Sequence, residues 1–294
     1  MKKAFYIFSI TFSVFISLMF TSCHDSIFET IENEIALDKS GIRGSMGSIV
    51  EYGGWLYITP MNKGVIYRKS ATANTKGGWQ KLSAPRTPVA IALDGGTLYM
   101  LAVDWAEGSG DYEGYNVPTY FEYTSTNGEN WSYTNRSFGY LENSSNLPLR
   151  YKNQCCSVTV NGITYSIPSS YSTDTISISS GGSFDVDEGY IYAITATGNS
   201  VIVGTENGLY SMHINGGSLE NKTSYVGDGS TDTNSTLSND VPIVYVPSAF
   251  RTVNEIEAVI YAYNCPRGSG GTTNEGLMAY FPYPVDKRGW NRDH

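Results

Sequence analysis

Residues 47–58 read GSIVEYGGWLYI, and residues 90–101 repeat the same order as AIALDGGTLYML. In both stretches an apolar run meets a Gly-Gly pair, and a second run that contains Leu-Tyr follows. Paired glycines adopt the positive φ angles of a two-residue hairpin turn, so each stretch predicts two antiparallel strands. The first stretch continues into a third run at 65–69 and, after a loop, into GGWQKL at 77–82. Together these segments predict a meander of four strands.

The same unit recurs along the chain, with copies that begin near residues 47, 89, 157, 190 and 258. A repeat of about 40–60 residues that forms a four-stranded meander is typical of a β-propeller blade. One meander cannot bury both of its faces, so the blades must cover one another. We therefore predict an all-β fold, a β-propeller of five four-stranded blades, with six blades as the alternative. A β-sandwich with chance similarity between the segments is the competing interpretation.

The first residues have the order of an export signal. Lys2 and Lys3 precede an apolar run over residues 4–20, and Thr21-Ser22-Cys23 follows. A charged region, an apolar region and a small residue before a cut define such a signal. This order resembles a bacterial lipoprotein signal with its lipobox, although Phe20 stands where that family usually has Leu. The alternatives are an ordinary secretory signal cut elsewhere and an uncleaved anchor, and all three place the domain outside the cytosol.

The lipoprotein resemblance implies a division of the chain. Residues 1–22 are the expected signal peptide, 23–44 a lipidated tether and 45–294 the propeller domain. In that family the cysteine, here Cys23, carries a diacylglycerol thioether, and its new amine is usually acylated. Two or more acyl chains anchor a protein stably. We expect a monomer in the bacterial cell envelope, held at the outer membrane or another envelope face, with residues near Ile42 completing the last blade.

The charge of the chain excludes one class of partner. The net charge is −9, and removing residues 1–22 takes away two lysines and no acid, which leaves −11. An acidic domain repels nucleic acid and anionic headgroups, so neither is an expected partner. The expected partners are the membrane, through the lipid, and an envelope protein or glycan.

A second motif supports the propeller prediction. The stretch TSTNGENW, which ends at Trp131, resembles the Asp-box of sialidase-like propellers, Ser-x-Asp-x-Gly-x-Thr-Trp. Thr124, Gly128 and Trp131 match, whereas Thr126 stands at the Asp position and Asn130 at the Thr position. In that family the box is a turn between the third and fourth strands, and its Trp packs between blades. The resemblance implies architecture and does not imply sialidase activity.

A third motif, GTENGLY at 204–210, resembles a hairpin of several extracytoplasmic propeller families. Within it, Asn207-Gly208 suits a two-residue turn that needs positive φ angles. The motif indicates the fold and says nothing about the ligand.

Few residues suggest catalysis or metal binding. The three histidines are isolated along the chain, and no nucleophile–base set or zinc spacing can be assembled from them. Acids at 104, 107 and 111, or at 185, 187 and 188, could bind Ca²⁺ through oxygen, but neither set follows an EF-hand loop. We predict no catalytic residue, no metal and no cofactor other than the lipid on Cys23.

The candidate ligand-binding residues lie in the long loop at 105–120, which is rich in Gly, Tyr and acids. Tyrosine gives a large contact area at low entropic cost, so loops of this composition are suited to binding. The alternative is an ordinary surface loop, and residues 227–240 form a second such insert. The candidates in and beside the first loop are Asp104, Glu107, Asp111, Tyr112 and Tyr115.

The cysteines of the folded part leave two possibilities open. Cys155, Cys156 and Cys265 cannot all pair within one chain. Adjacent residues of a strand point to opposite faces, so at most one of Cys155 and Cys156 faces Cys265. Either one disulfide forms, or the thiols serve as small buried apolar groups.

These features predict a membrane-anchored binding or interaction module whose ligand lies at the central mouth of the propeller or on its loops. One alternative is a carbohydrate-active enzyme, a glycosidase or lyase, that uses carboxylates and Tyr at that mouth. The other alternative is a scaffold of an envelope complex. Convergent Asp, Glu, Arg and Tyr side chains in a central pocket would favour the enzyme, and an apolar or Tyr-rich rim would favour binding.

Mass spectrometry of the mature N-terminus tests the lipoprotein interpretation. We expect the first residue to be Cys23, with the added mass of a diacylglycerol, because the lipobox places both cleavage and lipidation at this residue. A free, unmodified first residue other than Cys23 would contradict it.

Overall fold

The computed structural model describes the residues 42, 46–60, 64–108, 113–139, 148–152, 155–168, 173–223, 237, 240–265, 276–282 and 289–292. The expected signal peptide, Cys23 and nearly all of the tether lie outside these residues. Within the described part of the chain, no helix is long and apolar enough to cross a membrane.

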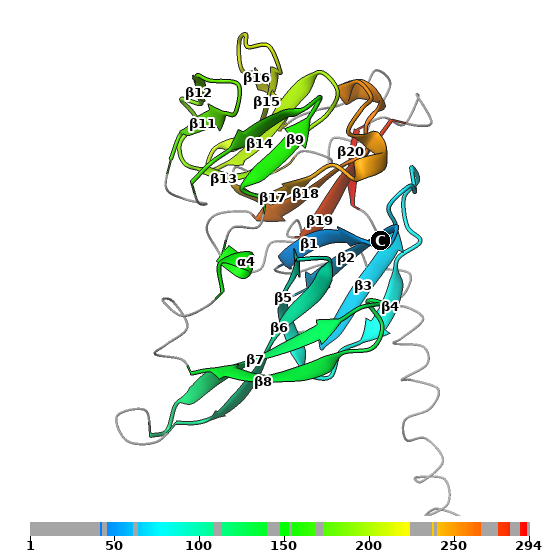
Figure 1. Ribbon diagram of the computed structural model, residues 1–294, viewed down its shortest axis with the longest axis vertical. Helices are drawn as coiled ribbons and strands as arrows, with labels where there is room; N and C mark the ends of the chain where they lie inside the picture. Colours follow the sequence, from blue (N-terminus) through cyan, green and yellow to red (C-terminus); the bar gives the residue numbers. More distant parts are fainter. Residues whose placement is uncertain are drawn as a thin grey trace, which may run out of the picture. The chain divides into compact units, whose positions relative to one another are not determined.

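The described strands form five antiparallel sheets of four strands each, and in every sheet the strands pair in chain order (Figure 1). The first sheet contains β1 (Met46–Tyr52), β2 (Trp55–Pro60), β3 (Val65–Ser70) and β4 (Gln80–Ser83). The second contains β5 (Thr87–Asp94), β6 (Thr97–Glu107), β7 (Asn116–Ser125) and β8 (Ser132–Phe138). The third contains β9 (Ser157–Val160), β10 (Ile163–Ser166), β11 (Thr175–Ile178) and β12 (Ser183–Asp185).

The fourth sheet contains β13 (Ile191–Ala196), β14 (Ser200–Thr205), β15 (Gly208–His213) and β16 (Glu220–Asn221). The fifth contains β17 (Asp240–Tyr245), β18 (Ile260–Cys265), β19 (Gly276–Phe281) and β20 (Gly289–Arg292). Short helical turns are α4 (Leu149–Lys152), η2 (Ser248–Phe250) and η3 (Glu255–Glu257). The all-β prediction is confirmed, and the fold is a β-propeller of five four-stranded blades.

The predicted hairpin turns are present. Gly53 and Gly54 have φ angles of 58° and 81°, and Gly95 and Gly96 have 55° and 77°. In the third sheet Asn161 takes the first of these positions, with a φ of 52°. Positive φ at both central residues matches the right-handed twist of the flanking strands, which is why these dipeptides form the first hairpin of the first three blades.

Two details of the sequence prediction are wrong. The fifth blade begins at β17, and the apolar run near residue 258 is its second strand. β17 is joined to β18 through η2 and η3 and not through a tight hairpin, so no local turn signal marked it. In the 204–210 motif the two-residue turn is Glu206-Asn207, because Gly208 already pairs with Thr205 as the first residue of β15.

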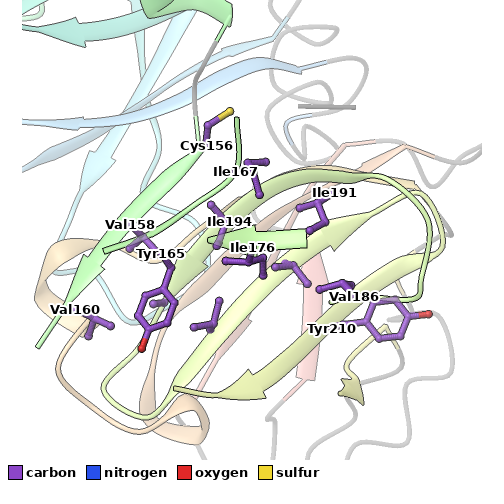
Figure 2. Close-up of a cluster of buried hydrophobic side chains, with 13 residues drawn as sticks. Cys156, Val158, Val160, Tyr165, Ile167, Ile176, Val186, Ile191, Ile194 and Tyr210 are labelled. Atoms are coloured by element: carbon purple, nitrogen blue, oxygen red, sulfur yellow. The ribbon is translucent and has the colours of Figure 1, made fainter. Parts of the chain in front are cut away.

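Apolar clusters fill the spaces between neighbouring sheets. One lies between the third and fourth sheets, where Val158 and Tyr165 lie near Ile194 at one end and Val186 lies beside Tyr210 at the other (Figure 2). Similar clusters join the fourth sheet to the fifth, the fifth to the first, and the first to the second. The sheets therefore cover one another face to face, as blades do.

The second sheet has a different partner on its other face. Ala90, Leu101 and Phe138 pack against Tyr151 of α4. Successive residues of a strand point to opposite faces, and Ile91 lies in the cluster toward the first sheet, so α4 covers the opposite face.

Backbones of neighbouring sheets come close at two glycines. A Cβ on Gly47 of β1 would overlap the carbonyl oxygen of Val89, and one on Gly204 of β14 would overlap that of Val241. Beside the first contact, the backbone N–H of Ile91 donates to Ser48 Oγ at 2.7 Å. Only glycine allows this approach of two strands.

A buried cation joins the fifth sheet to the first. Lys69 of β3 is 1% exposed, and its Nζ donates to the Thr75 carbonyl at 2.7 Å. The same Nζ lies 4.8, 5.6 and 5.7 Å from the ring centres of Phe281, Trp79 and Tyr261. A cation facing aromatic rings in a desolvated site stabilises this interface.

The turn that resembles an Asp-box joins β7 to β8, the third and fourth strands of its blade, as expected. Asn127 Oδ1 accepts the backbone N–H groups of Glu129 and Asn130 at 3.0 and 2.9 Å. Asn127 thus organises the turn, and the alignment of Thr126 with the Asp position is wrong by one residue. Trp131 packs against the cluster between the first and second sheets, which confirms its predicted place.

The described residue of the tether contacts the last blade. The N–H of Leu277 in β19 donates to the Ile42 carbonyl at 3.0 Å. Ile42 is also buried in the cluster between the fifth and first sheets. The last blade takes its four strands from β17 to β20, so among the described residues Ile42 adds a contact to this blade and does not supply one of its strands.

The close contacts at Gly47 and Gly204 generate a stability prediction. Gly47→Ala and Gly204→Ala should each lower the free energy of unfolding by about 1–3 kcal/mol, because the added methyl group overlaps a backbone carbonyl. Urea denaturation followed by circular dichroism measures the change. Gly139→Ala is the matched control, since a Cβ there has no neighbour within 4 Å. Equal stability of all three variants would contradict the close approach.

Candidate functional site: a cavity lined by the first strands

The first strands of all five sheets meet at one cavity of about 270 Å³. A first strand is the edge of its sheet, and an edge strand leaves part of its backbone N–H and C=O groups without a ladder partner. Some of these groups are already paired, as the Ile91 N–H is with Ser48 Oγ and the Ile194 N–H with the Cys155 carbonyl. The described lining consists of Ile49, Val50, Ile91, Ala92, Leu93, Arg150, Cys155, Ser157, Val158, Ile194, Thr195, Tyr245 and Arg251.

Arg251 follows η2, and its side chain is fixed at one end. Its Nε–H donates to the Val246 carbonyl at 3.0 Å. Its guanidinium lies 5.4 Å from the centre of the Tyr245 ring. Among the described residues, no carboxylate forms an ion pair with Arg251. The terminal nitrogens of this guanidinium are therefore free of a charged partner in the described structure.

Tyr245 shares a carboxylate with the turn that carries Arg251. Its hydroxyl donates to Glu51 Oε2 at 3.4 Å, and the Ser248 N–H donates to the same oxygen at 2.7 Å. Burial raises the pKa of the Tyr245 hydroxyl, so it stays neutral at physiological pH. Glu51 is thus held by β17 and η2.

Arg150 brings α4 to the cavity wall, and its charge is compensated. Its Nη1 donates to Asp94 Oδ2 at 2.5 Å, and its Nε lies 3.4 Å from Glu122 Oε1. The guanidinium also lies 3.8 Å from the centre of the Tyr99 ring. These contacts fasten α4 to the second sheet.

Glu122 is the buried carboxylate that holds α4 against the second sheet, and its side chain is only 1% exposed. Tyr151 Oη donates to its Oε1 at 3.1 Å, and Arg136 Nη1 lies 3.2 Å from its Oε2. Burial, followed by the charge of Glu122, raises the pKa of the Tyr151 hydroxyl. A buried carboxylate needs such partners, because an unpaired charge in the interior is costly.

Cys155 contributes a thiol to the cavity wall. It has a φ of 57°, which is uncommon for a residue with a side chain, and its carbonyl accepts the Ile194 N–H at 2.7 Å. Burial raises the pKa of its thiol to about 12. Neither Cys155 nor Cys156 forms a disulfide in the described structure, and Cys156 lies buried in the apolar cluster between the third and fourth sheets, as the second alternative predicts.

The predicted ligand-binding residues lie elsewhere. Asp104 and Glu107 are in β6, and Tyr115 lies between the two strands of the β6–β7 hairpin. Asp104 forms an ion pair with Arg86, and Tyr115 is 70% exposed. None of these three lines the cavity. Asp111 and Tyr112 lie outside the described residues, as does most of the insert at 227–240.

The described residues contain no cluster of three or more His, Cys, Asp or Glu side chains that could hold a metal ion. For the second acid set, Asp185 accepts a hydrogen bond from the Thr175 hydroxyl at 3.1 Å and Glu188 one from Tyr210 at 3.0 Å. These acids are thus used in local contacts.

A second hollow, of about 400 Å³, is built mainly by the fourth sheet and η3. Its lysine, Lys222, lies 2.8 Å from a Glu220 oxygen and 3.2 Å from a Glu255 oxygen. Because two carboxylates already pair with this lysine, the cavity at the first strands is the stronger candidate.

Sequence reasoning missed Arg150, Cys155, Tyr245 and Arg251. They come from separate parts of the chain, and only the packing of the blades brings them together. The available signal was weak: Arg251 is a cation in the connection between two apolar strands of an acidic chain.

No family model matches the chain, and no curated protein matches it. A luciferin-regenerating enzyme is similar over 87% of this chain and 97% of its own, with 7% identity and a TM-score of 0.42. The GH32 β-fructofuranosidase of Bombyx mori is similar over 90% of this chain and 68% of its own, with 12% identity and a TM-score of 0.38. A chain of a nidogen/laminin complex is similar over 59% of this chain and 61% of its own, with 15% identity and a TM-score of 0.24. These TM-scores are too low to carry an argument about function.

The raised pKa of Cys155 predicts a slow reaction with alkylating agents. With a pKa of about 12, the thiol is almost wholly protonated near neutral pH, and only the thiolate is nucleophilic. Iodoacetamide should leave Cys155 unmodified in the folded protein and should react faster as the pH rises toward that value. Peptide mass mapping measures the modification, and the urea-unfolded protein is the positive control. Rapid alkylation of the folded protein near neutral pH would contradict the burial.

Proposed function

We propose that this protein is a lipid-anchored binding protein of the bacterial cell envelope, which holds a small ligand in the cavity at its first strands. The observation that carries the proposal is the convergence of all five first strands on this cavity. Binding sites are typically concave and largely preformed, with a few placed polar groups. The two arginines, the tyrosine and the free strand edges supply such groups.

The size of the cavity limits the ligand. A volume of about 270 Å³ is at the lower end of ligand pockets, which span about 300–1,000 Å³. A small molecule or the terminal unit of a glycan suits this space, whereas a folded protein partner would have to bind outside it.

The lining favours binding over the carbohydrate-cleaving alternative. A glycosidase of the usual kind needs two carboxyl groups across its cleft. Among the described lining residues there is no Asp or Glu, and the neighbouring acids Asp94 and Glu51 are held by Arg150 and by Ser248. The cavity thus offers cations and hydrogen-bonding groups for binding, without the acid pair for that reaction.

The proposed anchor is the lipid on Cys23. The acidic domain is repelled by anionic headgroups, so electrostatic attraction to the membrane surface is not available to it. A covalent lipid provides the attachment that the charge of the domain opposes.

Filling the cavity tests the proposed function. Ser157 is exposed and lines the cavity, so Ser157→Trp adds a bulky side chain there without entering the core. The protein is purified from its own envelope, and co-purifying small molecules are extracted and measured by mass spectrometry. We expect at least one molecule that accompanies the wild type in stoichiometric amounts and is lost from Ser157→Trp.

Ser83→Trp is the matched control, because Ser83 is exposed on the outer strand β4 and does not line the cavity. It should retain the molecule. Equal recovery from the wild type and Ser157→Trp, or no recovered molecule from any of the three proteins, would contradict a ligand in this cavity.

A further inference from the structure

We infer that the cavity recognises an oxyanion, a carboxylate or phosphate group of a small molecule, through the terminal nitrogens of Arg251. The inference rests on the proposed function and adds the chemical class of the ligand. It depends on three observations: the charge of the lining, the different surroundings of its two arginines, and the way in which Arg251 is held.

The described lining residues include cations although the chain is acidic. The whole chain carries a net charge of −9, yet the described residues around the cavity include two arginines and no acid. A cavity whose walls carry one sign of charge concentrates ligands of the other sign. Because Asp94 and Glu122 compensate the charge of Arg150, the attraction of this cavity for an anion comes from Arg251.

The two arginines differ in whether a carboxylate compensates their charge. Arg150 faces Asp94 at 2.5 Å and Glu122 at 3.4 Å, so two carboxylates compensate its charge. Arg251 has no carboxylate partner among the described residues. The neighbouring acid, Glu51, instead accepts hydrogen bonds from Ser248 and Tyr245. Arg251 is thus the cation of the lining that lacks a compensating charge.

The side chain of Arg251 is preorganised for a planar acceptor. Its Nε–H is used by the Val246 carbonyl at 3.0 Å, and its guanidinium faces the Tyr245 ring. These contacts fix the plane of the guanidinium and leave the terminal N–H groups as donors. Arginine binds carboxylate and phosphate through two parallel hydrogen bonds, and a fixed side chain loses little entropy on binding.

Three sugars of nearly equal size test the inference. Glucuronate carries a carboxylate, glucose 6-phosphate carries a phosphate, and glucose carries no charge. Titration calorimetry with the full-length protein at low salt should detect at least one charged sugar, bound at least tenfold more tightly than glucose. The stronger of the two charged sugars then tells carboxylate from phosphate.

Arg251→Met should weaken the binding of that charged sugar by roughly tenfold to a hundredfold, as expected for the loss of a charge-assisted hydrogen-bonded pair. Lys81→Met removes one positive charge from the exposed surface of β4 and should leave binding unchanged. Arg251→Lys keeps the charge without the planar fork and should give an intermediate affinity.

The outcomes separate this inference from the proposed function. If glucose binds as tightly as the charged sugars and Ser157→Trp abolishes all binding, the oxyanion inference is wrong and the binding cavity stands. If neither charged sugar binds at millimolar concentration, or Arg251→Met binds as the wild type does, the oxyanion inference is likewise wrong. If Ser157→Trp also leaves the binding of every sugar unchanged, the cavity is not the binding site and both proposals fail.

Discussion

The fourth and fifth sheets of this protein contain strands that are buried on both faces, and a sheet of four strands cannot cover itself. Every residue of β13, β14 and β19 is buried, which means that both faces of the fourth and fifth sheets are covered by neighbours. Burial of apolar area is the main favourable contribution to folding, so the sheets must stack against one another. The apolar clusters between consecutive sheets satisfy this requirement, and α4 satisfies it on the second face of the second sheet.

The same requirement creates the cavity. Stacked twisted sheets approach one another most closely near their first strands, and Gly47 and Gly204 allow backbone to lie against backbone there. The space that remains between the five first strands is small. Side chains that enter it come from the connections, as Arg251 and Arg150 do. The binding chemistry of the cavity is thus decided by connecting segments, while the blades decide its size.

The fold could be predicted from the sequence to a large extent, because the signals are local. Gly53-Gly54 and Gly95-Gly96 adopt the positive φ angles of a tight turn, and each pair forms the first hairpin of its blade. The start of the fifth blade was not predictable in this way, since β17 ends in helical turns. The site was not predictable either, because Arg150 and Arg251 meet only through packing between distant segments. The composition of the loop around Tyr115 favours ligand binding. Composition indicates exposure and adaptability, but it does not indicate which side chains converge in the fold.

The cluster between the first and fifth sheets has a consequence for how the protein matures. It joins residues 42–71 to residues 259–281, so one of its halves is synthesised long after the other. Contacts of such high sequence separation form late, and domains that depend on them fold slowly. We expect the emerging chain to remain without this interface until the last blade has been made.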